Sequence, residues 1–465
     1  MVSEKLTERL IDFALHFKGE DIPAEVLEFQ KRVLADSVGV MAAATTLEPA
    51  CGSFIDFAVE NSPVGSCTVI GAAVKASPLM AALANGSLIH ALDYEDGHDR
   101  SKTHPNTASI PVMMALGQSL HRPGSEVLAA MVIASEITIR LKMSLTANDL
   151  IDCGLYSPPM FAAYGAVLGG ARLAGLDEMQ TLDALSLCMT QILLPGQSAR
   201  SAGSVLRGVR EALSARAAMF GILLAQKGVH ARMDEPFEGK FGLYMTCFRD
   251  RYEPDVILGG LGEHWEAARL RFKPYPCCGT THAVLDSLLS LMNEAGIAAD
   301  DIEEIHLVVN RPHINLLEPH DAKYRPRALA AAKFSLPFTV ALAAVNGRVT
   351  LDMYTEEALA DGKLLRLADK VTYTLREHED PEQFPDDHVE VIITAGGGRR
   401  FSKEVYVSSG SPLKPLSLEQ LKTKFFDCMA HGTRPCSREK SEIILSAVLS
   451  LEKYADFDEI CRLLD

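Results

Sequence analysis

The stretch 77–105, SPLMAALANGSLIHALDYEDGHDRSKTHP, joins an apolar segment to a cluster of titratable side chains. Its alanine- and leucine-rich first half predicts a buried helix over residues 79–92. Residues 90–105 then contain three histidines, four acidic residues, an arginine and a lysine. Carboxylates and imidazoles in a loop after a helix suit general acid–base catalysis. We expect this helix to end at a cleft that carries a functional site, and a solvated acidic loop is the alternative.

Length and composition narrow the class of protein. The chain has 465 residues, for which two or three domains are expected, and 48% of them are apolar, enough for sizeable cores. The formal charge of −16, without a block of basic and aromatic residues, argues against nucleic acid and anionic membranes as partners. The start, MVSEKLTERLIDF, lacks the apolar core of a signal peptide, and no apolar run of about 18 residues predicts a membrane span. Ten scattered cysteines without a CxxC pair fit reduced thiols, so we expect a cytoplasmic protein.

The first 265 residues have helical periodicity throughout. Gly165, Gly169 and Gly170 would permit close helix–helix packing. Helices are predicted over residues 6–17, 23–44, 79–92, 109–120, 125–142, 159–174, 177–194 and 207–227.

The pattern changes near residue 270, where segments rich in β-branched residues appear between helical ones. The glycines of AGGGR, 395–399, form a hairpin turn rather than a phosphate loop, because the Lys-Ser/Thr of a P-loop is missing. Strands are predicted over 301–310, 371–375, 388–394 and 400–409, and helices over 281–296, 327–346, 417–431 and 437–453. The expected fold is mainly α: a large helical domain formed by residues 1–268 and 412–465, with a smaller α+β lid domain, 269–411, inserted into it.

Two kinds of catalytic site find little support in the residue spacing. His98 and His104 are six residues apart near several acids, but neither HxxxH nor HExxH is present, so we predict no metal. No GxSxG elbow occurs, and Cys277 next to Cys278 lacks a recognised protease context. The cysteines also offer no obvious three-thiolate arrangement for an iron–sulfur cluster.

A second stretch, RFKPYPCCGTTH at 271–282, adds a candidate binding site. Its prolines favour a stiff turn, and Thr280 or Thr281 could cap the following helix. Lys273 and His282 near a helix N-terminus suit a carboxylate ligand, and a purely structural turn is the alternative.

Together the two stretches resemble the MmgE/PrpD family, which includes 2-methylcitrate dehydratases, cis-aconitate decarboxylases and iminodisuccinate epimerase. The family segment H-A-L-D-[FY]-[DE]-D…H-P matches residues 90–96 with His104 and Pro105, and K-P-Y-P-C-C…H matches residues 273–278 with His282. AKFSLPF at 332–338 and GSPLKPLSLEQLKTKF at 410–425 are also similar to family segments.

The resemblance implies a helical domain with an α+β lid, a homodimer, no cofactor, and an active site in the cleft between the domains. It assigns active-site roles to Asp93, His104 and Lys273. His282 matches as well, as a candidate substrate-binding residue.

The chain also departs from the family pattern. Tyr156 in GLYSPP stands where many members have histidine, and Arg210 in RGVREALSARAA stands where they have lysine, with Arg207 one turn earlier. Ala215 replaces a family glycine, and Gly97 replaces a threonine found in many dehydratases and decarboxylases.

Lys273, Arg207 and Arg210 would bind carboxylates, and Arg keeps its charge at all relevant pH values. The chemistry we expect is removal of a proton α to a carboxylate of a small di- or tricarboxylate, with cations stabilising the enolate-like state. Asp93 and His104 are the candidate acid–base pair, and Tyr156 beside Arg210 is a further proton carrier. A lyase is the leading interpretation. An epimerase or isomerase, or a binding protein without turnover, remains open, and the departures predict a substrate other than 2-methylcitrate or cis-aconitate.

Overall fold

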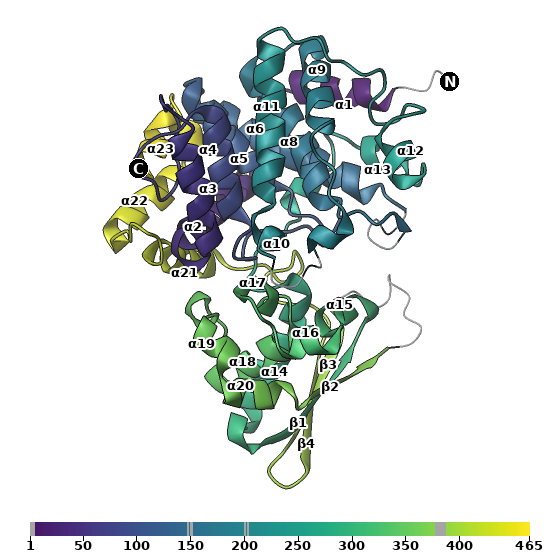
Figure 1. The fold of residues 1–465 in the computed structure, drawn as a ribbon, viewed down its shortest axis with the longest axis vertical. Helices are drawn as coiled ribbons and strands as arrows, with labels where there is room; N and C mark the ends of the chain where they lie inside the picture. The colour runs from purple at the N-terminus through teal and green to yellow at the C-terminus, as the bar shows by residue number, and fades with distance from the viewer. Residues whose placement is uncertain (1–4, 147, 149–151, 200, 202–203, 377–386) are drawn as a thin grey trace.

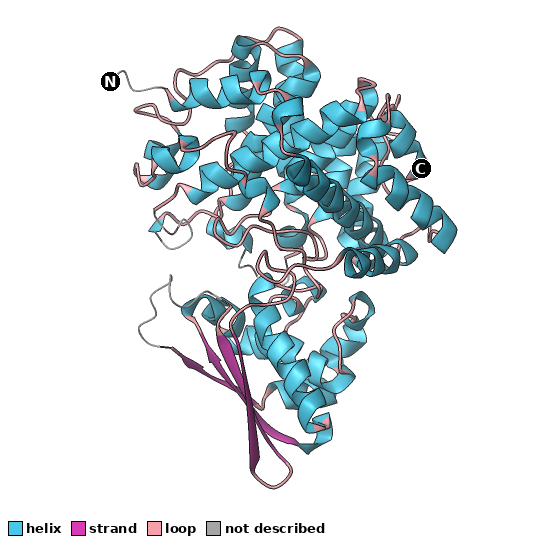
Figure 2. Cartoon of the chain, turned by 180° about the vertical axis from the view of Figure 1, so that it is seen from behind, coloured by secondary structure: helices cyan, strands magenta, loops and turns pink. Residues whose placement is uncertain are grey.

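The computed structural model describes residues 5–146, 148, 152–199, 201, 204–376 and 387–465. It is mainly helical, with one small sheet, as the sequence predicts (Figure 1, Figure 2). The N-terminal helices are α1 Leu6–His16, α2 Ala24–Leu47, α3 Pro49–Glu60, α4 Pro78–Ile89, α5 Asn106–Ser119, α6 Gly124–Met143, α8 Pro158–Ala174, α9 Glu178–Met189, α10 Leu206–Val209, α11 Glu211–Gln226, α12 Leu243–Phe248 and α13 Pro254–Leu258. The remaining elements are α14 His282–Ala295, β1 Ile302–Val309, α15 Ile314–Leu317, α16 His320–Tyr324, α17 Leu329–Ala332, α18 Leu336–Asn346, α19 Glu356–Ala360, α20 Gly362–Ala368, β2 Val371–Leu375, β3 Val389–Ala395, β4 Arg399–Val405, α21 Leu418–Ala430, α22 Arg438–Leu449 and α23 Asp458–Leu463.

Buried apolar side chains form two separate clusters. The larger is built from α1–α13 together with α21–α23, which we call the helical part. The smaller runs from Cys277 to Ala395 and is built from α14–α20 and the strands, which we call the mixed part. In Figure 1 the mixed part lies below the helical part, and α17 lies at the junction of the two, below α10. The chain enters the mixed part through residues 273–281 and leaves it after β4 to form the C-terminal helices.

Close packing in the helical part depends on glycines, as predicted. A Cβ atom at Gly165 of α8 would lie 2.0 Å from Thr138 Oγ1 of α6, and one at Gly169 would lie 2.6 Å from the carbonyl oxygen of Ala130. Only glycine therefore permits this approach of the two helices. Among the described helices, none is by itself long and apolar enough to cross a membrane; the bent pair α2 and α3 meets that criterion only when both are counted together.

The sheet of the mixed part has the strand order β2-β1-β3-β4. β1 and β2 are parallel, whereas β3 pairs antiparallel with β1 and with β4. Side chains alternate along β3, where Val389, Val391 and Ile393 are buried against α14. The helices cover one face of the sheet (Figure 2). Gly396–Gly398 form the predicted hairpin turn between β3 and β4.

The C-terminal helices return to the helical part, where α21 packs on α2. Lys424 of α21 is buried, and its Nζ lies 2.7 Å from Asp36 Oδ1 of α2 and donates to the backbone oxygen of Tyr94 at 2.6 Å. The same ammonium lies 3.9 Å from the centre of the Tyr94 ring. The C-terminal segment thus holds the acidic loop that follows α4 in place.

Two helices predicted as continuous are divided in the structure, and a third ends early. The predicted helix 79–92 ends at Ile89, 207–227 divides at Arg210 into α10 and α11, and 327–346 divides at residues 333–335 into α17 and α18. The last break has a local cause, because Ser335 Oγ accepts a hydrogen bond from the Phe338 backbone nitrogen at 3.1 Å and caps α18. Each of the three breaks lies at the junction of the two parts or beside it.

Candidate active site

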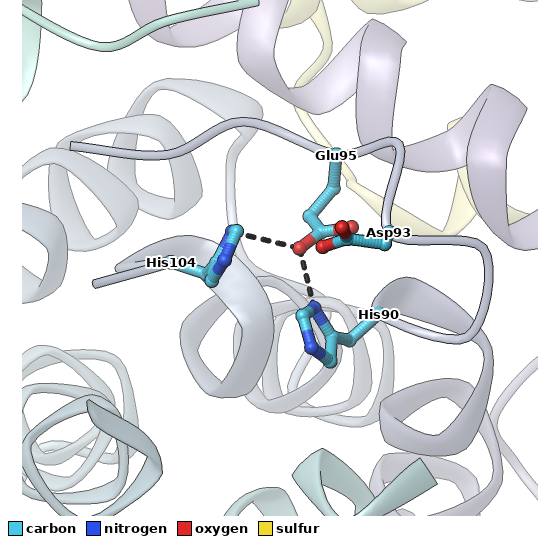
Figure 3. A group of neighbouring side chains, drawn as sticks. All are labelled: His90, Asp93, Glu95 and His104. Atoms are coloured by element: carbon cyan, nitrogen blue, oxygen red, sulfur yellow. Dashed lines mark hydrogen bonds and ion pairs between the residues drawn. The ribbon is translucent and has the colours of Figure 1, made fainter. Parts of the chain in front are cut away.

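The site begins where α4 ends. His90 is the C-cap of α4, and the chain then turns back through Asp93, whose φ of 50° is in the left-handed region. This turn directs Asp93, Glu95 and Asp96 inward, and all three are at least 97% buried. Figure 3 shows the side chains of His90, Asp93, Glu95 and His104 pointing toward one another. The acidic loop is therefore part of the interior rather than a solvated surface loop.

Close contact between α4 and α11 places Arg207 of α10 and Arg210, which lies between α10 and α11, near this loop. A Cβ atom at Gly86 would lie 3.0 Å from Ala212 Cα and from Ala215 Cβ, so the helices touch through small residues. Arg210 precedes α11 and is 1% exposed. Its guanidinium contributes to lowering the pKa of His90, after the larger effect of burial. The start of α11 is thereby held next to the end of α4.

Glu95 is the centre of the cluster. Its Oε1 lies 2.6 Å from His90 Nδ1 and 2.8 Å from His104 Nδ1 (Figure 3). His104 Nδ1 is also 2.8 Å from the backbone oxygen of Asp96. Two acceptors on Nδ1 require this nitrogen to carry hydrogen, which leaves Nε2 as the atom of His104 able to exchange a proton with a ligand. The side chain of His104 is 20% exposed, whereas those of His90 and Glu95 are fully buried.

The charges in this cluster follow from burial and pairing. Burial disfavours ionised Glu95, but His90, His104 and Lys273 around it outweigh that effect and hold its pKa well below the ordinary value. Burial likewise opposes charge on His104, yet the Glu95 carboxylate raises the pKa of its imidazole. Burial lowers the pKa of His90. The arrangement is a carboxylate that favours the protonated form of His104 and lies within hydrogen-bond distance of His90, whose neutral form burial favours.

Asp93 and Lys273 form a second pair from residues 180 positions apart. Lys273 Nζ donates to Asp93 Oδ1 at 2.7 Å and to the Asp93 backbone oxygen at 2.9 Å. Both side chains are buried, and Asp93 and Glu95 raise the pKa of Lys273 despite burial, which acts in the opposite direction. Asp93 therefore favours the charged form of Lys273, and its predicted acid–base role stays a prediction.

Tyr156 lies between two arginines. The guanidinium carbon of Arg210 is 4.1 Å from the centre of the Tyr156 ring, and that of Arg207 is 5.0 Å from it. Arg210 also donates to the Arg207 backbone oxygen at 2.9 Å and lies 3.5 Å from Glu211 Oε1. Arg207 reaches the mixed part, where it lies 4.1 Å from the centre of the Phe334 ring. The structure therefore brings Tyr156, Arg207 and Arg210 together, as the sequence suggests.

His282 occupies a different position from the other predicted site residues. It is fully buried, its Nε2 lies 3.2 Å from the Cys277 backbone oxygen, and burial keeps its pKa well below the ordinary value. It contacts the turn that carries Lys273 rather than the Glu95 cluster. Thr281 is the N-cap residue of α14, one of the two positions predicted, but its hydroxyl makes no hydrogen bond within the described residues and so does not cap the helix. His98 is also outside the cluster, where it contacts Ser101 and Glu266.

His90, Asp93, Glu95 and His104 present atoms within 4.8 Å of one another, a donor set that could hold a metal ion. Part of this set is already engaged, because both imidazoles bind Glu95 Oε1 and the Lys273 ammonium binds Asp93 Oδ1. The second oxygens of Asp93 and Glu95 and Nε2 of His90 have no hydrogen-bond partner among the described residues. A cation there would lie close to the Lys273 ammonium. The absence of a metal requirement stays a prediction.

Glu95 and His90 are members of the cluster to which the sequence assigns no role. Both belong to the motif at residues 90–96, but the motif does not predict their pairing across the turn. Their spacing of five residues around a helix end is a signal, although a weak one, because it acquires meaning only when the helix stops at Ile89.

Comparison with known proteins finds similarity along nearly the whole chain. The family model of the MmgE/PrpD N-terminal domain matches residues 8–255, and that of the MmgE/PrpD C-terminal domain matches residues 275–451. A cis-aconitate decarboxylase-like protein of Aspergillus oryzae is 26% identical and covers 99% of this chain and 97% of its own length. The cis-aconitate decarboxylases of Aspergillus terreus and Homo sapiens are each 24% identical, covering 99% and 100% of this chain and 96% and 95% of their own.

Proposed function

Because this chain belongs to the MmgE/PrpD family, we propose that it is a lyase acting on a small tricarboxylate of the cis-aconitate class. Relatives that are named cis-aconitate decarboxylases align with it from end to end, which supports a lyase of this kind. The observation that carries the proposal is the pairing of His104 with buried Glu95, next to the Lys273 ammonium.

This pairing makes His104 an acid before the reaction begins. The Glu95 carboxylate raises the pKa of His104 against the effect of burial, which favours the imidazolium form with a transferable proton on Nε2. An enzyme that had to remove a proton first would need a neutral imidazole instead. The resting state thus favours a reaction whose protein-dependent step is delivery of a proton to the substrate.

Decarboxylation fits this requirement. As the carbon–carbon bond to a carboxylate breaks, CO2 leaves and its bonding electrons shift through the neighbouring double bond to a carbon next to another carboxylate. The resulting enolate-like anion is stabilised by nearby cations, for which Lys273, Arg207 and Arg210 are the candidates. Nε2 of His104 then donates its proton to that carbon, and solvent later restores the proton on the imidazole.

Substrate binding rests on the same cations. The chain carries a net charge of −16, so a polyanion must be attracted by local positive charge. Arg207 and Arg210 supply permanent charge, and Lys273 is held in its charged form by Asp93. Because Tyr156 and Arg210 stand where many relatives have histidine and lysine, we propose a substrate related to cis-aconitate rather than cis-aconitate or 2-methylcitrate itself.

An epimerase is a second candidate, favoured by Tyr156. Two guanidiniums lie against its ring, so a side chain with an exchangeable hydroxyl proton stands beside permanent positive charge. A second proton carrier on an element remote from His104 in sequence is what an epimerase needs for the opposite face of its substrate.

The test is a panel of acids incubated with the protein in D2O and followed by NMR: cis-aconitate, related unsaturated tricarboxylates, 2-methylcitrate and iminodisuccinate. The proposal expects loss of CO2 or water from a tricarboxylate, with one solvent deuterium incorporated after decarboxylation. Exchange or inversion of a dicarboxylate without bond cleavage would establish the epimerase instead. A kcat/KM for 2-methylcitrate of about 10⁴ M⁻¹s⁻¹ or more would refute the proposed substrate preference.

A further inference from the structure

Lys333 is a buried lysine of the mixed part. It forms no ion pair within the described residues, and the proposed chemistry gives it no role. It follows α17 at the break before α18, and the residue is 4% exposed. Its backbone oxygen accepts a hydrogen bond from the Cys278 nitrogen at 3.0 Å, which ties it to the turn that carries Lys273. Figure 1 places α17 at the junction of the two parts.

The ammonium of Lys333 lacks a partner. Within the described part of the chain, no hydrogen bond or ion pair reaches its Nζ. The centre of the Tyr354 ring lies 5.8 Å from this nitrogen. The other buried lysines at the junction are engaged, since Lys273 binds Asp93 and Lys424 binds Asp36. A buried ammonium without an acceptor is costly, and a ligand with a carboxylate would remove that cost.

Burial is the largest influence on Lys333 and lowers its pKa to about 8, against the opposing fields of Glu48, Asp93, Cys51 and Cys277. Tyr354, which follows α18 in the chain, is a further ionisable residue close to the Lys333 ammonium. Neither carboxylate comes within ion-pair distance of Nζ. The amine is therefore only partly protonated near pH 8 and gains a proton when an anion arrives.

Arg207 is the second unpaired cation at this junction. Its Nε has no hydrogen-bond partner, and its guanidinium lies over Phe334, the residue that follows Lys333. Asp93 contributes to the electrostatic environment of both Arg207 and Lys333. Among the described residues these are two cations without an ion-pair partner, one from each part of the molecule: Arg207 lies over the Phe334 ring, and Lys333 precedes Phe334 in the chain. Such a pair suits a ligand with more than one carboxylate.

We propose that Lys333 is a substrate-binding residue that pairs with one carboxylate of the polycarboxylate substrate and takes up a proton from solvent as it does so. This inference rests on the proposed function for the identity of the ligand, and it adds a residue of the mixed part to the binding groups of the helical part. Substrate binding would then join the two parts through Arg207 on one side and Lys333 on the other.

The experiment is calorimetric titration of the full chain with tricarballylate, a saturated tricarboxylate, at pH 8 in two buffers of different ionisation enthalpy. The wild-type protein should take up on the order of half a proton per site, since a group with a pKa near 8 is half-protonated there. Lys333→Met should abolish the uptake and weaken binding by about tenfold or more. Lys333→Arg should keep binding within a few-fold and still lose the uptake, a separation that a purely structural role would not produce.

Lys363→Met is the matched control, because Lys363 belongs to the same part but pairs with Asp300 at the surface; its binding and proton uptake should equal the wild type. If Lys333→Met does not fold, Lys333→Arg decides, and unchanged proton uptake in that variant overturns the inference. Failure of the wild type to bind tricarballylate overturns it too. Lys333-dependent uptake in a protein that turns over no acid of the NMR panel would refute the proposed function and leave this inference standing.

Discussion

His104 Nδ1 lies 2.8 Å from Oε1 of Glu95, a carboxylate with no exposed side-chain surface. The contact fixes which nitrogen of the imidazole carries the internal hydrogen and raises the pKa of the ring. Because Glu95 is shared with His90 and lies near Lys273, its charge is retained in the interior. The proposed chemistry uses Glu95 as a positioning carboxylate and His104 as a proton donor, and it depends on both.

Glu95→Gln should lower the pKa of His104, because the amide carries no charge to stabilise the imidazolium. If protonated His104 is the acid, activity is present below its pKa in the folded protein and is lost as the pH rises through it. The descending limb of kcat/KM against pH should therefore move to lower pH in the variant. Glu266→Gln, which changes the comparable His98 pair away from the site, should leave the limb unchanged.

His104→Gln should reduce turnover by about 10²-fold or more while the melting temperature changes little, because the amide can keep one hydrogen bond but cannot transfer a proton. Steady-state kinetics on the true substrate together with thermal unfolding measure both quantities. His98→Gln, from the same loop, is the control. Near-normal turnover of the His104 variant would assign this residue a structural role.

Tyr156→Phe should lower kcat and leave substrate affinity largely intact, because the ring remains to pack against both guanidiniums while the hydroxyl is lost. Arg210→Ala should act mainly on binding, since it removes a permanent charge. Tyr406→Phe, at an exposed position, should change neither quantity. Equal effects of Tyr156→Phe on KM and kcat would argue that the hydroxyl contacts the substrate in its ground state.

Asp96→Asn should make the protein more stable above neutral pH. Burial raises the pKa of Asp96 to about 7, and only one of its oxygens has a partner, Asn106 Nδ2 at 2.8 Å. Between its unfolded pKa and about 7, the folded state binds more protons than the unfolded state, so this residue makes stability fall as pH rises. Melting temperatures at pH 5 and pH 8 should differ less in the variant, whereas Asp300→Asn, an exposed acid, should behave like the wild type.

Prolonged dialysis against EDTA should leave activity unchanged. In the His90, Asp93, Glu95 and His104 cluster, both imidazoles lie against Glu95 Oε1 and the Lys273 ammonium lies 2.7 Å from Asp93 Oδ1, so a cation would meet a positive charge that is already in place. Elemental analysis before and after dialysis checks this. Stoichiometric zinc or iron whose removal abolishes activity would contradict it.

The sequence by itself determined the fold class, because helix and strand periodicities are local properties of the chain. The strands around the AGGGR turn, the long helices and the glycines of α8 were all predicted from short windows. It also identified Asp93, His104, Lys273, Tyr156, Arg207 and Arg210, since these stand in motifs or in departures from them. Five of these six contact another member of the set, and His104 joins them through Glu95.

Only the tertiary structure decided which charges pair and, apart from the Ser335 cap at the start of α18, where the helices stop. The predicted helices 79–92, 207–227 and 327–346 have continuous periodicity, yet they break at His90, Arg210 and Lys333. Lys273 meets Asp93 across 180 positions, whereas Lys333 forms no ion pair with any acid of the described residues. Burial and pairing set the charge of each group, and both depend on side chains brought together from distant segments, which no local pattern of residues records.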